Sequence, residues 1–175
     1  AIMAVHPISG RGGKSLSDVW AHGPQTYLGV TVAGFPNLFM ITGPGSPSVL
    51  SNMAVSIEQH VDWVVERIAA LRDAGFTTME ATDTAQAGWE RHMADCATLT
   101  LHRLANTWYT GANVPGKPQG VMPYTGGVGP YRSICNEVVG RGMLGFRLTG
   151  PGVAEQCNDG EVVRLQPDVR LVLGM

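Results

Sequence analysis

One long stretch of the chain has the hydrophobic spacing of an amphipathic helix. Between residues 50 and 71, apolar side chains recur every three or four positions, and polar side chains fill much of the opposite face. This spacing predicts a helix of about six turns that buries one apolar stripe. The stripe consists of Leu50, Met53, Ala54, Ile57, Val61, Val64, Ile68 and Leu71. Gly75 is placed to end the helix, because glycine readily adopts the left-handed conformation that follows a helix C-terminus.

Three further helices are predicted. The longest runs from Thr84 to about residue 103, since Asp83 followed by Gln86 is the pattern of an N-cap with a reciprocal partner three residues later. Its apolar stripe comprises Trp89, Met93, Cys96, Ala97 and Leu101. Shorter helices are expected at residues 16–20 and 131–139.

Four short strands are also expected. Residues 2–5 and 38–41 are apolar runs bounded by turn signals, and the second has the length of a strand buried on both faces. Near the C-terminus, residues 160–165 and 169–173 alternate between apolar and polar side chains, as half-buried strands do.

Residues 42–48, Thr-Gly-Pro-Gly-Ser-Pro-Ser, separate the strand expected at 38–41 from the long helix. They read G-x-G-x-x-S, one residue short of the dinucleotide-binding fingerprint, and the two prolines lack backbone donors that a pyrophosphate needs. The helix start behind this turn offers free N–H groups, which favour an anion or an electron-rich carbonyl. The alternative is an ordinary helix start capped by Ser46 or Ser48.

Composition and charge exclude several function classes. The net charge is -2 and the 12 Lys and Arg residues are scattered, so nucleic acid and acidic membrane surfaces are not expected partners. No apolar run approaches the ~18 residues of a membrane span. Cys96, Cys135 and Cys157 form no CxxC pair, so we expect buried free thiols, no metal site and a cytoplasmic location.

The proportion of charged residues, 15%, is low against a typical ~25%. Gly is abundant, with 23 residues. These values leave two interpretations open. The chain is a compact domain rich in tight turns, or it is a piece whose surface is covered by further protein.

Several specific sequence blocks follow one another in order between about residues 10 and 148. They occupy residues 20–29, 32–39, 42–48, 50–53, 57–60, 106–109, 113–118 and 123–129. Together these blocks resemble the Baeyer–Villiger flavin monooxygenase family, and within it the cyclohexanone, phenylacetone and steroid monooxygenase branch.

The resemblance implies an α/β fold, the C-terminal portion of a flavoprotein with two dinucleotide-binding domains, incomplete without its N-terminal Rossmann segments. Residues 1–149 would form the C-terminal part of the FAD-binding monooxygenase domain, and residues 150–175 a tail of unknown role. Family members are oxidoreductases that use FAD and NADPH. They insert one oxygen atom of O2 beside a ketone carbonyl, giving an ester or lactone.

The resemblance also implies roles for individual residues. The cofactor-binding candidates near the flavin are Gly43, Pro44, Ser51, Asn52 and Met53. Ser48, Val49 and Leu50 match the loop that borders the ketone pocket. Trp108 and Lys117 match a mobile segment that closes over NADP. No residue of this chain matches a catalytic residue, and none is expected to bind metal.

Other family features are absent from the chain: the FAD fingerprint, the second fingerprint for NADP, the family signature, and the arginine that acts during oxygenation. Three hypotheses follow. The chain is part of a complete enzyme, whose partners are the remainder of the flavoprotein, a small ketone and O2. It is a non-catalytic remnant. It is a binding module that keeps the pocket loops.

Overall fold

The computed structural model describes residues 7–47, 51–100 and 122–161. In this part of the chain, strands β1 (Thr78–Ala81), β2 (Phe146–Thr149) and β3 (Gln156–Asn158) form an antiparallel sheet in that order. The mixture of helices and sheet agrees with the expected fold class.

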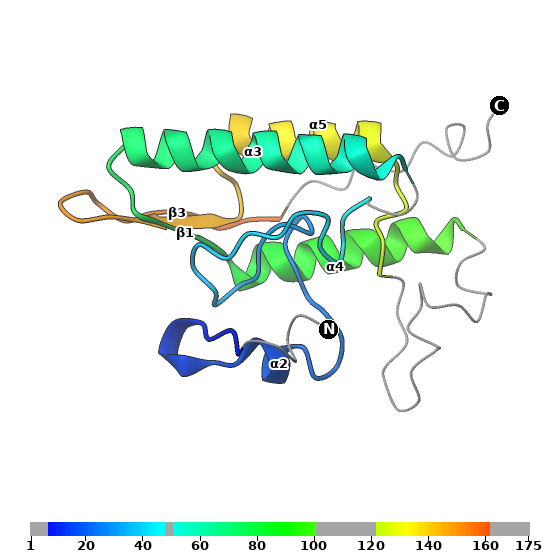
Figure 1. The fold of residues 1–175 in the computed structure, drawn as a ribbon, viewed down its shortest axis with the longest axis horizontal. Coiled ribbons are helices and arrows are strands. Elements are labelled where there is room, and N and C mark those ends of the chain that lie inside the picture. The colour runs from blue at the N-terminus through cyan, green and yellow to red at the C-terminus, as the bar shows by residue number, and fades with distance from the viewer. Residues whose placement is uncertain (1–6, 48–50, 101–121, 162–175) are drawn as a thin grey trace.

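Helices cover both sides of this sheet (Figure 1). Helices α3 (Met53–Asp73) and α5 (Val128–Gly140) lie on one side, and α4 (Asp83–Thr98) lies on the other. Side chains from all three helices and from the sheet meet in one core. Its largest fully buried members are Trp89, Tyr27, Tyr124, Tyr131, Phe146, Leu28, Met79 and Ile134.

A second, smaller core holds the N-terminal part of the described chain. The 3-10 helix η1 (Arg11–Gly13) and the short helix α2 (Leu16–Val19) lie below α4 in Figure 1. The buried side chains of this smaller core are Leu16, Val32 and Phe35. The helix predicted at residues 16–20 is therefore confirmed.

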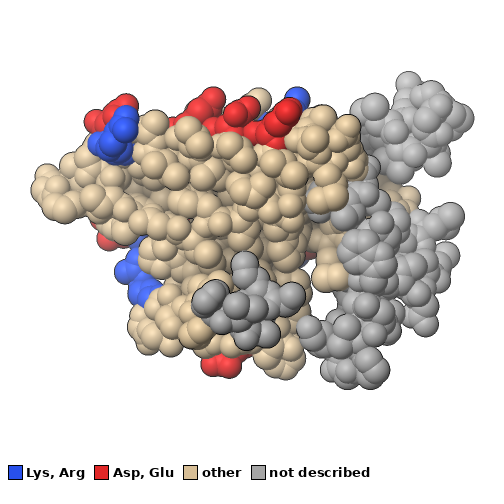
Figure 2. All heavy atoms as spheres, viewed as in Figure 1, with Lys and Arg blue, Asp and Glu red and all other residues tan. Residues whose placement is uncertain are grey.

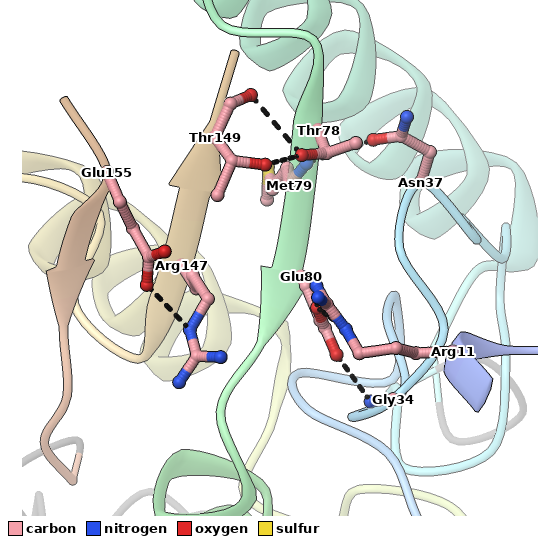
Figure 3. A network of polar contacts seen from close by, with 9 residues as sticks. All are labelled: Arg11, Gly34, Asn37, Thr78, Met79, Glu80, Arg147, Thr149 and Glu155. Atoms are coloured by element: carbon pink, nitrogen blue, oxygen red, sulfur yellow. Dashed lines mark hydrogen bonds and ion pairs between the residues drawn. The ribbon is translucent and has the colours of Figure 1, made fainter. Parts of the chain in front are cut away.

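Glu80 of β1 joins this N-terminal part to the sheet (Figure 3). The carboxylate accepts from the Gly34 N–H (3.1 Å) and from Arg11 Nε (3.1 Å), and it forms an ion pair with the Arg11 guanidinium. Because Glu80 is only 8% exposed, these partners compensate a charge that would be costly to bury alone.

Asn37 closes the outer edge of β1. Its backbone N–H donates to the Met79 carbonyl (2.9 Å), and its Oδ1 accepts from the Met79 N–H (3.0 Å). Its Nδ2 donates to the Thr77 carbonyl (3.0 Å). One residue thus supplies hydrogen bonds that a neighbouring strand would otherwise make.

The strand predicted at residues 38–41 is wrong. These residues form a loop in which Met40 N–H donates to the Val30 carbonyl (2.8 Å) and Ile41 is 40% exposed. Asn37, directly before this loop, occupies the edge of β1 with its side chain, so residues 38–41 do not pair there.

The sheet itself was not predicted. β2 reads Phe-Arg-Leu-Thr, and its side chains alternate between buried and exposed or half-buried positions, as expected for a strand with one covered face. β3 lies just before the strand expected at residues 160–165, of which only 160 and 161 are described, and those two are not in a strand. The strands expected at 2–5 and 169–173 lie outside the described residues. The division at residue 149 stays a prediction, although β3 pairs with β2 across it.

The second long helix is confirmed, with changes at its ends. Helix α4 is capped by Thr82, whose hydroxyl accepts from the Ala85 N–H (3.2 Å), so Asp83 is the first helical residue and not the cap. The Gln86 side chain instead accepts from the Ala33 N–H (2.8 Å). The helix ends at Thr98, earlier than predicted. The helix predicted at 131–139 is confirmed as α5.

Helix α3 has the predicted period, but the face that it buries is rotated away from the predicted stripe. Its buried residues are Ser56, His60, Trp63 and Val64. Five large apolar residues face outward, and we call them the outer stripe: Met53 (48% exposed), Ile57 (40%), Val61 (40%), Val65 (59%) and Ile68 (50%). Among the described members of the predicted stripe, Val64 alone is at 8% exposure or less. The apolar arc of this helix is wider than the face that the described chain covers.

His60 occupies the inward face of α3 as a neutral imidazole. Its Nδ1 accepts from the Thr42 N–H (2.9 Å), and its Nε2 lies 2.8 Å from the Tyr131 hydroxyl. Since Tyr131 donates its hydroxyl proton to the Leu28 carbonyl (2.6 Å), Nε2 carries the imidazole proton and donates to Tyr131. Burial lowers the pKa of His60 from 6.5 to about 4.

The orientation of α3 predicts that replacing isoleucine with alanine lowers the free energy of unfolding by different amounts at two positions. Ile57→Ala, in the outer stripe, should lower the free energy of unfolding by under about 0.5 kcal/mol. Ile134→Ala, on α5 at 0% exposure, should cost roughly 2–5 kcal/mol because it leaves a cavity in the core. Urea denaturation of both variants measures the difference. Equal losses would mean that the outer stripe is packed in solution.

The buried imidazole predicts a loss of stability in acid. The pKa of His60 is lower in the folded chain, about 4, than its ordinary value of 6.5, so its contribution is complete above pH 6.5 and declines as the pH falls toward 4. The slope from this group approaches about 1.4 kcal/mol per pH unit. Denaturation at several pH values should show that the wild type loses its advantage over His60→Gln across this window. Parallel pH profiles would contradict the assignment.

Candidate functional site

The loop of residues 42–47 begins with a strained residue. Thr42 has φ +53°, in the left-handed region that a β-branched side chain rarely adopts. Such a conformation costs on the order of 1–3 kcal/mol and persists only where the surroundings hold it. The hydrogen bond from the Thr42 N–H to His60 is one such constraint.

Side chains and backbone from three other segments hold the rest of the 42–47 loop. Thr26 Oγ1 donates to the Pro44 carbonyl (2.8 Å), and the Trp89 indole N–H donates to the Gly45 carbonyl (3.2 Å). The Gly45 N–H donates to the Met122 carbonyl (2.8 Å), and the Tyr124 N–H donates to the Ser46 carbonyl (2.9 Å). The loop is thereby fixed in place before any ligand binds.

Two glycines are required by how closely the loop is packed. A Cβ on Gly43 would lie 2.6 Å from the Gly29 carbonyl oxygen. A Cβ on Gly45 would lie 2.7 Å from Thr26 Oγ1 and 3.2 Å from Trp89 Nε1, at a backbone φ of +85°. A side chain at either position would therefore displace the atoms that hold the loop.

The loop does not present a pyrophosphate-binding turn. The Gly45 N–H is paired with Met122, and the Ser46 N–H donates to the Gly43 carbonyl (3.1 Å). Pro44 and Pro47 have no N–H to offer. What the loop exposes is a half-buried surface of small residues, which suits contact with a flat ring better than with a phosphate.

Helix α3 does not begin directly behind the turn, so the alternative of a helix start capped by Ser46 or Ser48 is wrong. The cap is Asn52, whose Oδ1 accepts from the Ala54 N–H (3.0 Å). Ser51, just before this cap, donates to the Pro47 carbonyl at the end of the loop (2.9 Å). The helix start is therefore satisfied in part by its own cap.

An aromatic cluster lies against the loop from the core side. Trp89 stacks on Tyr124 with ring centroids 5.1 Å apart, and Trp89 also contacts Tyr131 edge-on at 6.0 Å. The Tyr124 hydroxyl lies 3.2 Å from His92 Nε2. Burial raises the pKa of both tyrosines above the ordinary value, so they stay protonated at neutral pH.

The cysteines are unpaired, and two of them match the expectation. Cys96 and Cys135 are buried, and burial raises the pKa of each thiol, to about 11 for Cys135. Neither is a ready nucleophile, because the thiolate is the reactive form. Cys157 on β3 is exposed, so its predicted burial is wrong.

The structure describes five of the residues predicted to bind cofactor. Gly43 and Pro44 are half-buried in the loop, and Ser51 is half-buried behind it. Asn52 and Met53 are exposed where α3 begins. The remaining candidates lie outside the described residues: Ser48, Val49, Leu50, Trp108 and Lys117.

Sequence reasoning missed the residues that hold the loop. Thr26, His60 and Tyr124 lie in blocks that carry the resemblance but received no role, and Trp89 was predicted only as part of an apolar stripe. For His60, the sequence of α3 did contain an indication of its role. A histidine among apolar positions on a long helix is costly to bury unless its ring nitrogens have partners.

One apolar cavity of about 250 Å³ lies at the other end of α3, between this helix, α5 and the sheet. Its lining includes Arg67, Leu71, Phe76, Met143 and Leu148. Arg67 is 14 residues beyond Met53, or roughly 21 Å along the helix axis, so the cavity is remote from the loop. Within the described ranges, no helix has the length and apolar character needed to cross a membrane.

Comparison with known sequences identifies relatives that are monooxygenases and are much longer than this chain. No family model matches the chain. It is 39% identical over 143 residues to the acetone monooxygenase (methyl acetate-forming) of Gordonia sp. (strain TY-5), covering 81% of this chain and 27% of that protein. It is 37% identical over 141 residues to the cyclohexanone 1,2-monooxygenase of Acinetobacter sp, covering 81% and 26%. The chain spans about a quarter of the length of these relatives.

Solved structures agree with the sequence comparison. An oxidized steroid monooxygenase bound to NADP superimposes with a TM-score of 0.75 at 45% identity, covering 82% of this chain and 26% of that one. Cyclohexanone monooxygenase from Rhodococcus sp. Phi1 bound to NADP+ gives 0.80 at 37% identity, covering 86% and 28%. OTEMO in complex with FAD and NADP gives 0.77 at 32%, covering 85% and 27%. The chain is therefore similar to the Baeyer–Villiger monooxygenases over a segment about a quarter as long as those enzymes.

Proposed function

We propose that this chain supplies the flavin-facing and ketone-facing loops of an FAD- and NADPH-dependent Baeyer–Villiger monooxygenase. The reaction inserts one oxygen atom of O2 beside a ketone carbonyl and gives an ester or lactone. The chain acts together with the dinucleotide-binding part of such a flavoprotein.

The observation that carries this proposal is the prearranged 42–47 loop. A strained Thr42, two glycines without room for a side chain, and tethers from Thr26, Trp89 and Met122 fix the loop more firmly than a connecting turn requires. Strain of this kind gathers at ligand sites, where a fixed surface is needed. The relatives that share this segment include structures bound to NADP, and one bound to FAD and NADP.

The residues present fit the ring of a flavin better than its phosphates. Gly43 and Pro44 offer a small, half-buried surface, and the paired N–H groups of Gly45 and Ser46 are not free for a pyrophosphate. We assign flavin contact to Gly43, Pro44, Ser51, Asn52 and Met53. When bound, the flavin supplies the electrons and the oxygen activation, while these residues orient it and exclude water.

The other predicted roles belong to this proposal. Ser48, Val49 and Leu50 border the ketone pocket, and Trp108 and Lys117 contact NADP. The three cysteines are unpaired, which is typical of a reducing compartment, and we place the enzyme in the cytoplasm.

The second candidate function is a non-catalytic remnant or binding module that keeps these loops. The observation in its favour is that the described groups around the loop provide no ionised nucleophile or base, since the buried thiols and phenols are held protonated. It differs from the first function in lacking oxygen transfer.

A hybrid flavoprotein tests the function. Residues 7–149 would replace the corresponding part of the steroid monooxygenase, and the 175-residue chain would be purified alongside. The hybrid should carry flavin and convert a ketone to an ester with consumption of NADPH. The isolated chain should carry none, since it lacks a pyrophosphate-binding turn. A hybrid that binds FAD but forms no ester would favour the non-catalytic alternative.

Gly45→Ala should weaken flavin binding in the same hybrid. The new Cβ must displace the Thr26 hydroxyl and the Trp89 indole, which hold the loop. The loop would then shift, and a displaced surface would fit the rigid flavin ring less well. We expect a rise in the FAD dissociation constant of about tenfold, equivalent to ~1.4 kcal/mol. The matched control is Gly129→Ala on α5, where a Cβ meets nothing within 4 Å. If both variants bind FAD equally, the loop does not position the flavin.

A further inference from the structure

The apolar cavity at the C-terminal end of α3 has one wall that is strained and firmly held. Met143, on the turn between α5 and β2, lines the cavity with φ +62°, in the left-handed region that residues other than glycine seldom adopt. This turn is held from β3, because Asn158 Nδ2 (3.2 Å) and Gln156 Nε2 (3.4 Å) both donate to the Gly142 carbonyl. Strained residues that their surroundings hold in place gather at ligand sites.

The size of the cavity suits a small molecule. Its volume is about 250 Å³, and most of its lining is apolar, including Leu71, Phe76 and Leu148. An engineered apolar cavity of about 150 Å³ holds benzene, so this one has room for roughly ten non-hydrogen atoms. Ala70 and Gln156 of the lining are exposed, so the cavity opens to solvent and a ligand can enter.

Arg67 is the charged residue among the described lining residues, and its donors are not all used. Its side chain is 13% exposed, and its Nη2 lies 3.0 Å from the carboxylate of Glu66. The guanidinium also lies over the Trp63 ring, 5.9 Å from the centroid. Within the described residues, Arg67 Nε is buried without a hydrogen-bond partner. A buried N–H without an acceptor is costly, and a small turn of this long side chain brings an N–H to an acceptor in the cavity.

The charges around Arg67 favour a neutral acceptor over an anion. Glu66 already balances the charge of the guanidinium. Glu58 and Asp62 are exposed on the same helix, and Figure 2 shows acidic side chains gathered along the edge of the molecule above α3. A carboxylate ligand would be repelled by this edge and would bring an uncompensated negative charge into an apolar cavity. The cavity therefore suits an apolar body that carries one neutral hydrogen-bond acceptor.

We propose that this cavity binds a small, neutral carbonyl compound, a ketone or an ester, whose oxygen accepts from the Arg67 guanidinium. The apolar part of the ligand contacts Leu71, Phe76 and Met143. The site is remote from the 42–47 loop and needs no flavin. The inference thus goes beyond the proposed function and does not depend on it.

Two probes of similar shape test the ligand class in the 175-residue chain. Acetophenone and benzoate have the same number of non-hydrogen atoms, and a methyl group in the ketone replaces an oxygen of the carboxylate. NMR of the Met143 and Leu148 methyl groups should show saturable shifts with acetophenone, with a dissociation constant on the order of 1 mM. Benzoate should bind at least tenfold more weakly, because the acidic edge repels it.

Two substitutions test the position of the ligand. Arg67→Met keeps the apolar length of the side chain and removes its donors, so it should weaken acetophenone binding about tenfold. Ala70→Phe adds a ring at an exposed position of the lining and should abolish binding by filling the cavity. The matched control is Ala87→Phe, at an exposed position on α4, which should leave binding unchanged. Melting temperatures show whether each variant is folded.

Four results would each overturn the inference. Benzoate that binds as tightly as acetophenone would make the cavity an anion site. Acetophenone that binds Ala70→Phe like the unsubstituted chain would lie elsewhere. The absence of saturable shifts at tenfold the expected dissociation constant would mean that the cavity is closed. A folded Arg67→Met that binds acetophenone normally would show that the guanidinium is not the donor. If Arg67→Met does not fold, the two probes and Ala70→Phe still decide the question.

Discussion

The fold around the candidate site depends on one neutral imidazole. His60 links the Thr42 N–H at the start of the loop to Tyr131 on α5, which in turn reaches the Leu28 carbonyl. The His60–Tyr131 pair therefore joins segments that are distant in sequence. A charged imidazole could not accept from Thr42, so the loop geometry requires that the ring stay neutral. Burial favours the neutral form and thus stabilises the strained residue indirectly.

This arrangement explains why α3 has two unlike faces. The side turned toward the sheet carries Ser56 and His60 because it must satisfy polar groups of the loop region as well as pack on the core. Its apolar residues are divided between Trp63 and Val64, which lie inside, and the outer stripe.

The sequence predicted the helices well because their period is a local property. It could not say which arc of α3 faces the core, since the hydrophobic spacing is the same whether the arc packs on this chain or on another protein. β2 was open to prediction from its alternation, but its pairing of Phe146 with Ala81 depends on the tertiary fold. The resemblance located the 42–47 loop. The hydrogen bonds that Thr26, Trp89 and Met122 make to the loop were not predicted, because these residues are distant from it in the sequence.

The way in which Asn37 closes β1 affects how copies of this chain can associate. An open strand edge invites further strands, and a chain with a wide apolar surface would be at risk of ordered β-aggregation. Here the Met79 N–H and carbonyl are both occupied by Asn37. The opposite edge of the described sheet is β3, which has only 3 residues and offers little template. Pairing of further strands with the described sheet, from another copy of this chain or from any other source, is therefore disfavoured at both edges.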